Sequence, residues 1–430
     1  MAKKTVAFRT IGCKQNQYDT DFLKEAFLKR GYELREEGPA DLVVINTCAV
    51  TAKSAAKCRQ AIRSAARTGA KVLVTGCYPQ VAADEVKDLP GVIVVSGVRG
   101  RSGLVDLAEE ALSTGKTIVD VKPHEKGEEF EETPVEKPSL TRAFLKIQEG
   151  CGDFCTYCIV PYARGPSRSR SLESILEEAK NLVEKGYREI VLTGTHLGLY
   201  GKDSGQKLRL SDVVKRLSEV EGLVRLRLSS LEPHDVADDL IDCLRLPQVC
   251  HHLHLPLQSG SDRILRMMGR RYDVRGFLST VEKCRTVAPD LGLTTDIIVG
   301  FPGETVEDFR DTLKVVREVS FSRLHVFKFS ARPGTPAYRF PGKVREQDKE
   351  ERSRELISLG RELSLEFHRK HIGRTLEVLV EDSRSEGGLL QGLTRNYVRC
   401  WFSGPDELKG NLVSVVGRKA TKEGLACDRI

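Results

Sequence analysis

Three cysteines lie within eight residues of the chain, in the segment "EGCGDFCTYCIVP". Cys151, Cys155 and Cys158 have the spacing C-x3-C-x2-C. Three thiolates so spaced fit a 4Fe–4S cluster that leaves one iron open to bind another molecule. Structural zinc is the alternative, but tetrahedral zinc normally takes four ligands, and the nearest histidines in the sequence, His124 and His196, are both distant. The spacing therefore favours an iron–sulfur cluster.

A second set of three cysteines shares a local context. Cys13, Cys48 and Cys77 end the segments "TIGC", "INTC" and "VTGC", each after an apolar run that predicts a strand. Loops at the carboxyl ends of parallel strands meet at one edge of the sheet, so the pattern predicts a second cluster there. Burial as packing thiols is the alternative, because cysteine is often buried. Cys58 falls within a predicted helix, and we expect it to be structural.

Length and composition restrict the class of protein. The 430 residues allow two or three domains, and no apolar run reaches the roughly 18 residues of a membrane span. The chain starts without a signal-peptide pattern, so we expect a soluble cytoplasmic protein with no membrane partner. In that compartment twelve cysteines favour metal binding or catalysis over disulfides. The formal charge of +7 is compatible with an RNA partner but does not establish one.

Periodicity predicts an α/β protein with three domains. Residues 1–118 alternate short β-branched runs with amphipathic stretches, which predicts an open parallel sheet. Residues 119–140 are charged and contain prolines, and are expected to be a linker. Residues 141–370 repeat the pattern six times and end in a long charged helix near 346–369, which predicts a partial (β/α)6 barrel. Residues 371–430 change to period two, which predicts a small antiparallel β-barrel.

These features together resemble the radical S-adenosylmethionine methylthiotransferases over nearly the whole chain. The likeness is carried by "TRAFLKIQEGCGDFCTYCIVPYARGPSRSRS", "HLHLPLQSGSDRILRMMGRRY" and "DIIVGFPGET". It implies two 4Fe–4S clusters and S-adenosylmethionine as cofactors, a C-terminal RNA-binding TRAM domain, and an electron donor such as flavodoxin or ferredoxin. Cys151, Cys155 and Cys158 would hold the radical-generating cluster, and Tyr157 would lie against the adenine of S-adenosylmethionine.

Two segments, "TIGCKQNQYD" and "LTGTHLGLYG", resemble the branch that modifies carbon 2 of N6-threonylcarbamoyladenosine beside the tRNA anticodon. The implied partner is the tRNA anticodon stem-loop. Gln15 and Thr195 differ from the residues expected most often at their positions. The alternatives are the branch for isopentenyladenosine, which usually has "GQN" where "GTH" stands here, and the branch for a ribosomal protein. A zinc-stabilised, non-catalytic RNA-binding protein is the alternative from a different class.

Further candidate residues lie at predicted strand ends and in basic segments. The strand-end residues are plausible S-adenosylmethionine contacts, although tight turns explain glycine and serine there equally well. They are Gly194, Ser229, Ser230, Gln258 and Gly300. The basic residues are candidate contacts to the RNA backbone, with a solvated surface as the alternative. They are Lys53, Lys57, Arg59, Arg63 and Arg67 in one helix, and Arg164, Arg168 and Arg170 after the first cysteine motif.

Overall fold

The N-terminal domain is an open parallel sheet covered by helices on both faces. The computed structural model describes residues 4–36, 38–125, 127–203 and 208–430. Six strands pair in the order β2-β1-β3-β4-β5-β6, all parallel. Their bounds are Thr5–Thr10 (β1), Glu33–Leu34 (β2), Leu42–Thr47 (β3), Lys71–Gly76 (β4), Val92–Ser96 (β5) and Ile118–Asp120 (β6). The sheet confirms the fold predicted for this part of the chain.

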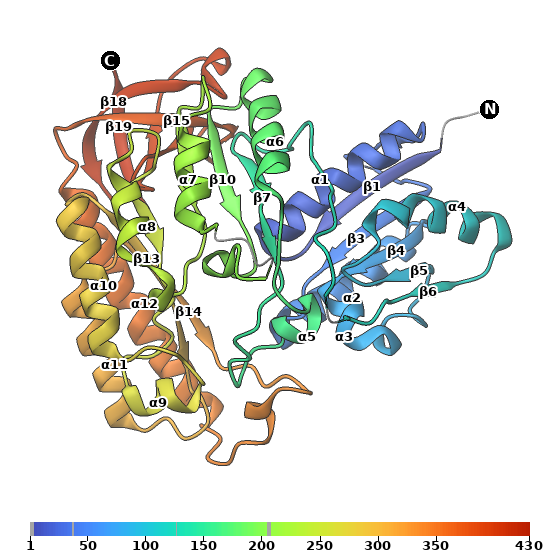
Figure 1. Cartoon of the computed structure of the whole chain (residues 1–430), viewed down its shortest axis with the longest axis horizontal. Helices are drawn as coiled ribbons and strands as arrows, with labels where there is room; N and C mark the ends of the chain where they lie inside the picture. The colour runs from blue at the N-terminus through green and yellow to red at the C-terminus, as the bar shows by residue number, and fades with distance from the viewer. Residues whose placement is uncertain (1–3, 37, 126, 204–207) are drawn as a thin grey trace.

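Helices cover both faces of this sheet (Figure 1), and an apolar layer lies between the sheet and the helices on each face. The helices are α1 (Lys14–Lys29), α2 (Ala52–Ala66), α3 (Cys77–Ala82) and α4 (Leu104–Thr114). Leu23 and Phe27 of α1 share one layer with Leu104 of α4, whereas Ile62 of α2 and Tyr78 of α3 belong to the other. Every residue of β3 is buried, as expected for a central parallel strand with both faces covered.

The second domain is a partial barrel of six parallel strands. They are β7 (Ala143–Lys146), β10 (Glu189–Thr193), β11 (Arg225–Leu228), β12 (His252–His254), β13 (Gly292–Val299) and β14 (Arg323–Lys328). The sheets β11-β10-β7 and β12-β13-β14 are joined by bridges from Leu226 to Val249 and from Ser230 to His254. Strands β7 and β14 are thus the free edges of an open barrel. This confirms the predicted partial (β/α)6 architecture.

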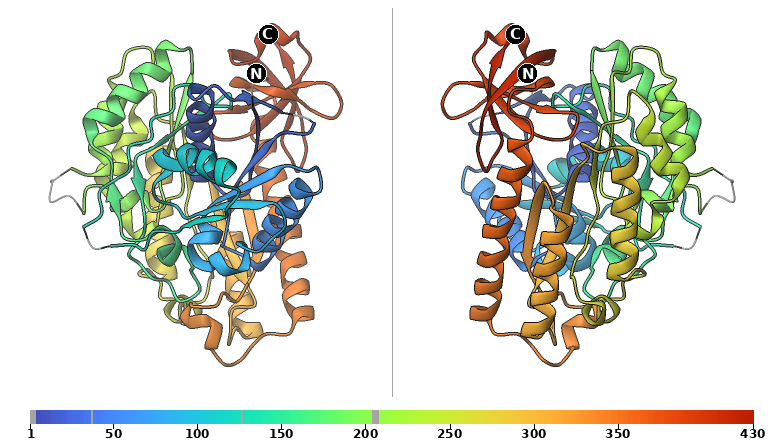
Figure 2. Two further views of the ribbon diagram at one scale, coloured as in Figure 1. Left: turned by 90° about the vertical axis from the view of Figure 1, so that its right-hand side faces the viewer. Right: turned by 90° about the vertical axis from the view of Figure 1, so that its left-hand side faces the viewer.

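Helices cover the outside of this barrel. They are α6 (Leu172–Glu184), α7 (Leu210–Ser218), α8 (Asp238–Asp242), α9 (Asp262–Met267), α10 (Val274–Val287), α11 (Val306–Val319) and α12 (Glu346–Arg369). Helix α12 packs against β14 and runs along the molecule to the C-terminal domain (Figure 2). No described helix combines the length and apolarity needed to cross a membrane.

The C-terminal domain is a closed five-stranded barrel. Its strands are β15 (Thr375–Arg384), β16 (Leu390–Thr394), β17 (Arg399–Phe402), β18 (Leu412–Ala420) and β19 (Leu425–Arg429). They close in the order β15-β16-β17-β19-β18. Four of the neighbouring pairs are antiparallel and one, β17 with β19, is parallel, so the predicted small C-terminal β-barrel is confirmed with one parallel pair. Closure leaves no free sheet edge in a domain whose core is small.

The segment between the first two domains is packed against both of them. Strand β6 reaches Asp120, two residues past the expected end of the N-terminal domain. Thr133 and Val135 are buried, and Glu128 forms an ion pair with Arg168 at 2.7 Å. The charged residues of this segment, which led us to expect a linker, supply carboxylates to buried arginines.

Candidate functional site

The three N-terminal cysteines lie on neighbouring strands. Cys13 follows β1 and precedes α1, Cys48 follows β3, and Cys77 begins α3 directly after β4. Because β1, β3 and β4 are adjacent in the sheet, the three thiols meet at its carboxyl edge. Cys13 and Cys48 are close enough to act electrostatically on the thiol of Cys77. The strand pattern therefore placed these residues where the structure has them.

Glycine is required beside one of these cysteines. Gly76 has a φ of 101°, and a Cβ there would lie 2.5 Å from the Asn46 side-chain oxygen and 2.7 Å from the Thr47 carbonyl oxygen. No side chain fits, so the chain turns sharply into Cys77. Asn46 in turn accepts a hydrogen bond from Asn16 Nδ2 at 2.8 Å, which ties the start of α1 to the end of β3.

The donor set at this edge suits a metal cluster. Burial raises the pKa of the Cys77 thiol to about 11 and also raises the pKa of Cys48. Thiols held neutral in this way become thiolates when a metal binds and releases their protons. Cys58 is different: it is buried within α2, and its sulfur lies 3.7 Å from the Cys48 carbonyl oxygen as a weak donor. This agrees with a structural role.

Arg164 connects the N-terminal cysteines to the barrel domain. It ends the short helix α5 (Val160–Arg164), which begins two residues after Cys158. Its Nε donates to Cys77 Sγ at 3.3 Å and its Nη2 donates to Asn16 Oδ1 at 3.0 Å. A guanidinium in this position stabilises a thiolate at Cys77 by charge as well as by hydrogen bonding.

Buried carboxylates neutralise this arginine and its neighbours. Asp19 of α1 and Glu149 of β8 (Gln148–Glu149) lie at the domain junction, where Lys146 Nζ is 2.7 Å from Asp19 Oδ1. Arg101 Nη2 lies 3.1 Å from Asp19 and 2.9 Å from Glu149. Arg164 Nη1 lies 2.5 Å from Glu149 Oε1. The junction is therefore a dry ion-pair network shared by both domains.

The expectation that three arginines after the cysteine motif contact RNA is wrong. Arg164, Arg168 and Arg170 are at most 4% exposed. Arg168, in β9 (Arg168–Ser169), pairs with Glu128, and Arg170 pairs with Glu178 of α6. The sequence showed these charges but not the acidic residues that the fold brings against them.

The C-x3-C-x2-C motif occupies the loop between β8 and α5 at the mouth of the barrel. Arg270 Nη1 donates to Cys155 Sγ at 3.4 Å. Burial raises the pKa of Cys158 to about 12, so this thiol also needs a metal to ionise near neutral pH. Arginine donors thus reach one cysteine of each triplet.

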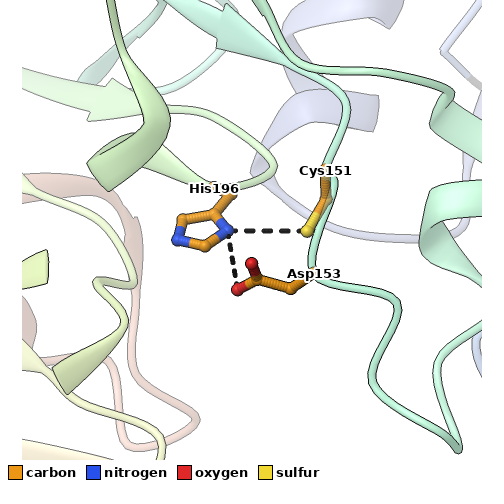
Figure 3. Close-up of side chains that lie close together, drawn as sticks. All are labelled: Cys151, Asp153 and His196. Carbon is orange, nitrogen blue, oxygen red and sulfur yellow. Dashed lines mark hydrogen bonds and ion pairs between the residues drawn. The ribbon is translucent and has the colours of Figure 1, made fainter. Parts of the chain in front are cut away.

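His196 lies against Cys151, although 45 residues separate them in sequence. Its Nδ1 is 3.5 Å from Cys151 Sγ and 3.4 Å from Asp153 Oδ2 (Figure 3). Burial lowers the pKa of His196, but its bonds to Asp235 and Cys151 outweigh this and raise it to about 10. Cys151, Asp153 and His196 each place a ligand atom within 4.8 Å of the others, so the fold brings beside this motif a nitrogen donor that the sequence spacing did not show. This arrangement fits a histidine that supports a cysteine ligand.

A cavity of about 160 Å³ opens beside this motif. Tyr157 and Cys158 line it together with Gln258, and Val50 and Thr51 close it from the N-terminal domain. Gln258 has a φ of 62°, and its buried Oε1 has no hydrogen-bond partner among the described residues. A polar ligand would satisfy a buried oxygen of this kind on a residue that lines the cavity.

The other strand-end candidates do not line this cavity. Gly194 and Ser229 follow β10 and β11, and Ser230 bridges to His254. Gly300 follows β13 and donates its amide to Glu304 at 2.7 Å. Among the predicted S-adenosylmethionine contacts, Tyr157 and Gln258 are the two that share a cavity with a cysteine of the motif.

Four cations of α2 and its C-terminus are exposed. They are Lys53, Lys57, Arg63 and Arg67, here called the α2 basic stripe. Arg59 is half-buried and forms an ion pair with Glu85 at 3.3 Å. The helix begins four residues after Cys48, so the α2 basic stripe adjoins the carboxyl edge of the N-terminal sheet, where the three cysteines lie.

Sequence reasoning missed three polar neighbours of the cysteines. Lys14 directly follows Cys13, His196 follows β10, and Arg270 follows α9. The strand-end position of His196 was the one available signal, because side chains there face the mouth of a barrel. Nothing in the local sequence indicates that Arg270 reaches Cys155.

Two family models match the chain. The Radical SAM superfamily matches residues 145–316, and the uncharacterized protein family UPF0004 matches residues 5–97. Two threonylcarbamoyladenosine tRNA methylthiotransferases, from Bacillus subtilis and Thermotoga maritima, are 41% and 40% identical to it. The alignments cover 97% and 98% of this chain and 94% and 96% of theirs. The chain belongs to the radical S-adenosylmethionine tRNA methylthiotransferases.

A relative with a different named activity also matches this methylthiotransferase. A tRNA-2-methylthio-N(6)-dimethylallyladenosine synthase from Pelotomaculum thermopropionicum is 36% identical over 94% of this chain and 93% of its own. The radical S-adenosylmethionine methyltransferase TsrM from Kitasatospora setae shares the fold, with a TM-score of 0.56 at 16% identity over 78% of this chain and 74% of its own. Proteins of this family use S-adenosylmethionine and 4Fe–4S clusters, and methylthiotransferases carry two clusters.

Proposed function

We propose that this protein adds a methylthio group to carbon 2 of N6-threonylcarbamoyladenosine beside the tRNA anticodon. The observation that carries the proposal is the convergence of Cys13, Cys48 and Cys77 on one sheet edge joined to the mouth of a C-x3-C-x2-C barrel. The full-length likeness to threonylcarbamoyladenosine tRNA methylthiotransferases supports the choice of nucleotide. The substrate is the anticodon stem-loop, and the reaction takes place in the cytoplasm.

Each cysteine triplet holds one 4Fe–4S cluster. Cys151, Cys155 and Cys158 hold the cluster that binds S-adenosylmethionine, and the N-terminal triplet holds the auxiliary cluster. When bound, these groups supply hydrogen-atom abstraction from adenine and the methylthio group itself. A flavodoxin or ferredoxin supplies the electrons.

The residues of the chain bind, orient and exclude water. Tyr157 and Gln258 contact S-adenosylmethionine in the cavity beside Cys158. Arg164 and Arg270 donate hydrogen bonds to Cys77 and Cys155 and thereby fix those side chains. The buried ion pairs around Asp19 keep water out of the junction between the domains.

The α2 basic stripe contacts the RNA backbone. Its four cations are exposed, and the helix leads away from the edge where the target nucleotide is modified. Phosphate contacts of this kind position a substrate without reading its sequence.

The test is modification of a defined RNA by reduced, anaerobically reconstituted protein. Anticodon stem-loops carrying either N6-threonylcarbamoyladenosine or isopentenyladenosine are incubated with S-adenosylmethionine, and nucleosides are analysed by mass spectrometry. A methylthio product from the first RNA alone supports the proposal. Product from the isopentenyladenosine RNA alone would assign the protein to the other branch. Stoichiometric zinc without iron would instead favour a non-catalytic RNA-binding protein.

A further inference from the structure

Lys14 is a half-buried cation without a carboxylate partner among the described residues. It begins α1, and its Nζ donates to Ser229 Oγ at the end of β11, at 3.3 Å. Among the described residues, no carboxylate oxygen lies within the 4.0 Å of an ion pair from this Nζ. Lysines removed from water are nearly always paired, because an unpaired charge loses its hydration without compensation.

The groups around Lys14 add positive charge. Arg142 and Arg227 both lie close enough to act on it electrostatically, and Tyr397 and the adjoining thiol of Cys13 act on it in the opposite sense. Both arginines have acidic partners: Arg142 bonds to Glu381 at 3.1 Å, and Arg227 bonds at 2.6 Å to Glu189, which also pairs with Arg225 at 3.5 Å.

Strand β13 also supplies no acidic partner to Lys14. Asp296 of β13 pairs with His254 Nε2 at 3.4 Å. Lys14 therefore has no carboxylate partner of its own among the described residues, which favours an incoming anion.

The position of Lys14 relates it to the target nucleotide. It adjoins Cys13 of the auxiliary site, while Ser229 lies on the reactive face of the barrel. Carbon 2 and N6 of adenine lie on the same edge of the base, separated by one ring nitrogen. A base with carbon 2 at the cysteine edge thus presents its N6 substituent to the same region.

We propose that Lys14 binds the free carboxylate of the threonylcarbamoyl group and thereby selects this nucleotide over isopentenyladenosine, an inference that rests on the proposed function. The threonine unit ends in a carboxylate, whereas the isopentenyl group is uncharged. The Lys14–carboxylate contact is charge-assisted, and Ser229 holds the ammonium toward the site.

The test compares two RNAs that differ in one charge. One anticodon stem-loop carries N6-threonylcarbamoyladenosine, and the other carries its methyl ester. For the wild-type protein, esterification is expected to raise KM about tenfold or more, as for loss of a charged hydrogen bond. In Lys14→Met the KM for the RNA with the free carboxylate should rise to the KM for the esterified RNA. The ratio of the two KM values then approaches one. Equilibrium binding of both RNAs, followed by fluorescence anisotropy, should change in the same way.

Lys29→Met is the matched control. Lys29 lies on the same helix, is exposed, and pairs with Glu136 at 3.0 Å. It should retain the wild-type ratio, and both variants should retain the wild-type iron content.

Three results would overturn the inference while leaving the function intact. They are a wild-type protein that does not distinguish acid from ester, a Lys14→Met variant that still does, and an equal loss on both RNAs. The wild-type comparison needs no variant, so it remains decisive even if Lys14→Met fails to fold. Failure of the proposed function is a separate result, in which wild-type protein modifies isopentenyladenosine RNA but neither threonylcarbamoyl RNA.

Discussion

The hydroxyl of Thr195 donates a hydrogen bond to the side-chain oxygen of Gln15 at 2.9 Å, across the junction of the first two domains. The amide of Gly150, beside Cys151, donates to the same hydroxyl at 3.1 Å. Gln15 Nε2 donates to the carbonyl of Gln148 at 2.9 Å. The two residues that departed from the family pattern are therefore partners, and they tie the Cys13 loop to the Cys151 loop.

Removing the Thr195 hydroxyl should destabilise this junction. Thr195→Val leaves the buried Gln15 oxygen without its donor, which costs about 1–3 kcal/mol of unfolding free energy. Gln15→Leu in the same background should recover at most part of that loss, because it removes the unsatisfied side-chain oxygen but also the donor to the Gln148 carbonyl. Urea unfolding measures both. Thr286→Val, whose exposed hydroxyl bonds only to the Glu282 carbonyl, is the control and should change stability little.

The hydrogen bond from Arg164 should raise the reduction potential of the auxiliary cluster, because positive charge stabilises the reduced form. A charged hydrogen bond is worth about 1.5–3 kcal/mol, and about 1.4 kcal/mol corresponds to 59 mV for one electron. We expect Arg164→Gln to lower the midpoint potential by roughly 60 mV or more. The measurement is a redox titration in the Cys151→Ala/Cys155→Ala/Cys158→Ala background, which leaves the auxiliary site.

Arg164→Lys keeps the charge near Cys77 and separates electrostatics from packing. Its potential should lie between those of the wild type and Arg164→Gln. An unchanged potential in Arg164→Gln, with iron content retained, would show that the 3.3 Å contact to Cys77 does not tune the cluster.

Iron content should divide equally between the two triplets. The intact protein is expected to bind about eight irons, and Cys13→Ala/Cys48→Ala/Cys77→Ala about four, because each 4Fe–4S cluster depends on its own thiolates. Cys58→Ala is the control, since it removes a buried thiol from the same region without removing a ligand. Loss of iron in Cys58→Ala would contradict the assignment of its role.

Neutralising the α2 basic stripe should weaken RNA binding and its salt dependence together. Each phosphate contact contributes about 0.7–0.9 to the slope of log affinity against log salt. Replacing Lys53, Lys57, Arg63 and Arg67 by glutamine should reduce that slope by up to about three. Arg310→Gln/Lys314→Gln removes exposed cations from α11 and should leave the slope unchanged. Equal effects in both variants would indicate non-specific attraction only.

The ionisation of Glu149 should make the free energy of unfolding depend on pH in the acid range. Burial alone would raise its pKa, but Arg101 and Lys146 outweigh burial and hold the pKa well below its usual range. A depressed folded pKa contributes stability above the unfolded value of about 4.3 and loses it as pH falls through the folded value. Glu149→Gln should therefore cost about 3–5 kcal/mol near neutral pH, with the difference from wild type shrinking below about pH 4.

Glu136→Gln controls for the loss of a carboxylate as such. Its exposed ion pairs with Lys29 and Lys185 should contribute less than about 1 kcal/mol to the free energy of unfolding. Urea midpoints across the acid range give both comparisons. A wild-type-like midpoint for Glu149→Gln at neutral pH would show that the junction tolerates unpaired cations.

The sequence by itself determined the elements and the two cysteine triplets. Period-two and helical patterns are local properties, so they predicted the parallel N-terminal sheet, the six-stranded partial barrel and helix α12 at its observed residues. The strand-end position of Cys13, Cys48 and Cys77 was also local, and parallel pairing made their convergence a consequence.

Only the tertiary structure decided which charges are free and which are paired. Arg164 and Arg63 look alike in sequence, yet one is buried against Asp19 and Glu149 while the other is exposed. Lys14 meets Ser229 from 215 residues away. Pairing depends on which side chains the fold brings within a few ångströms, and local patterns carry no information about contacts so distant in the chain.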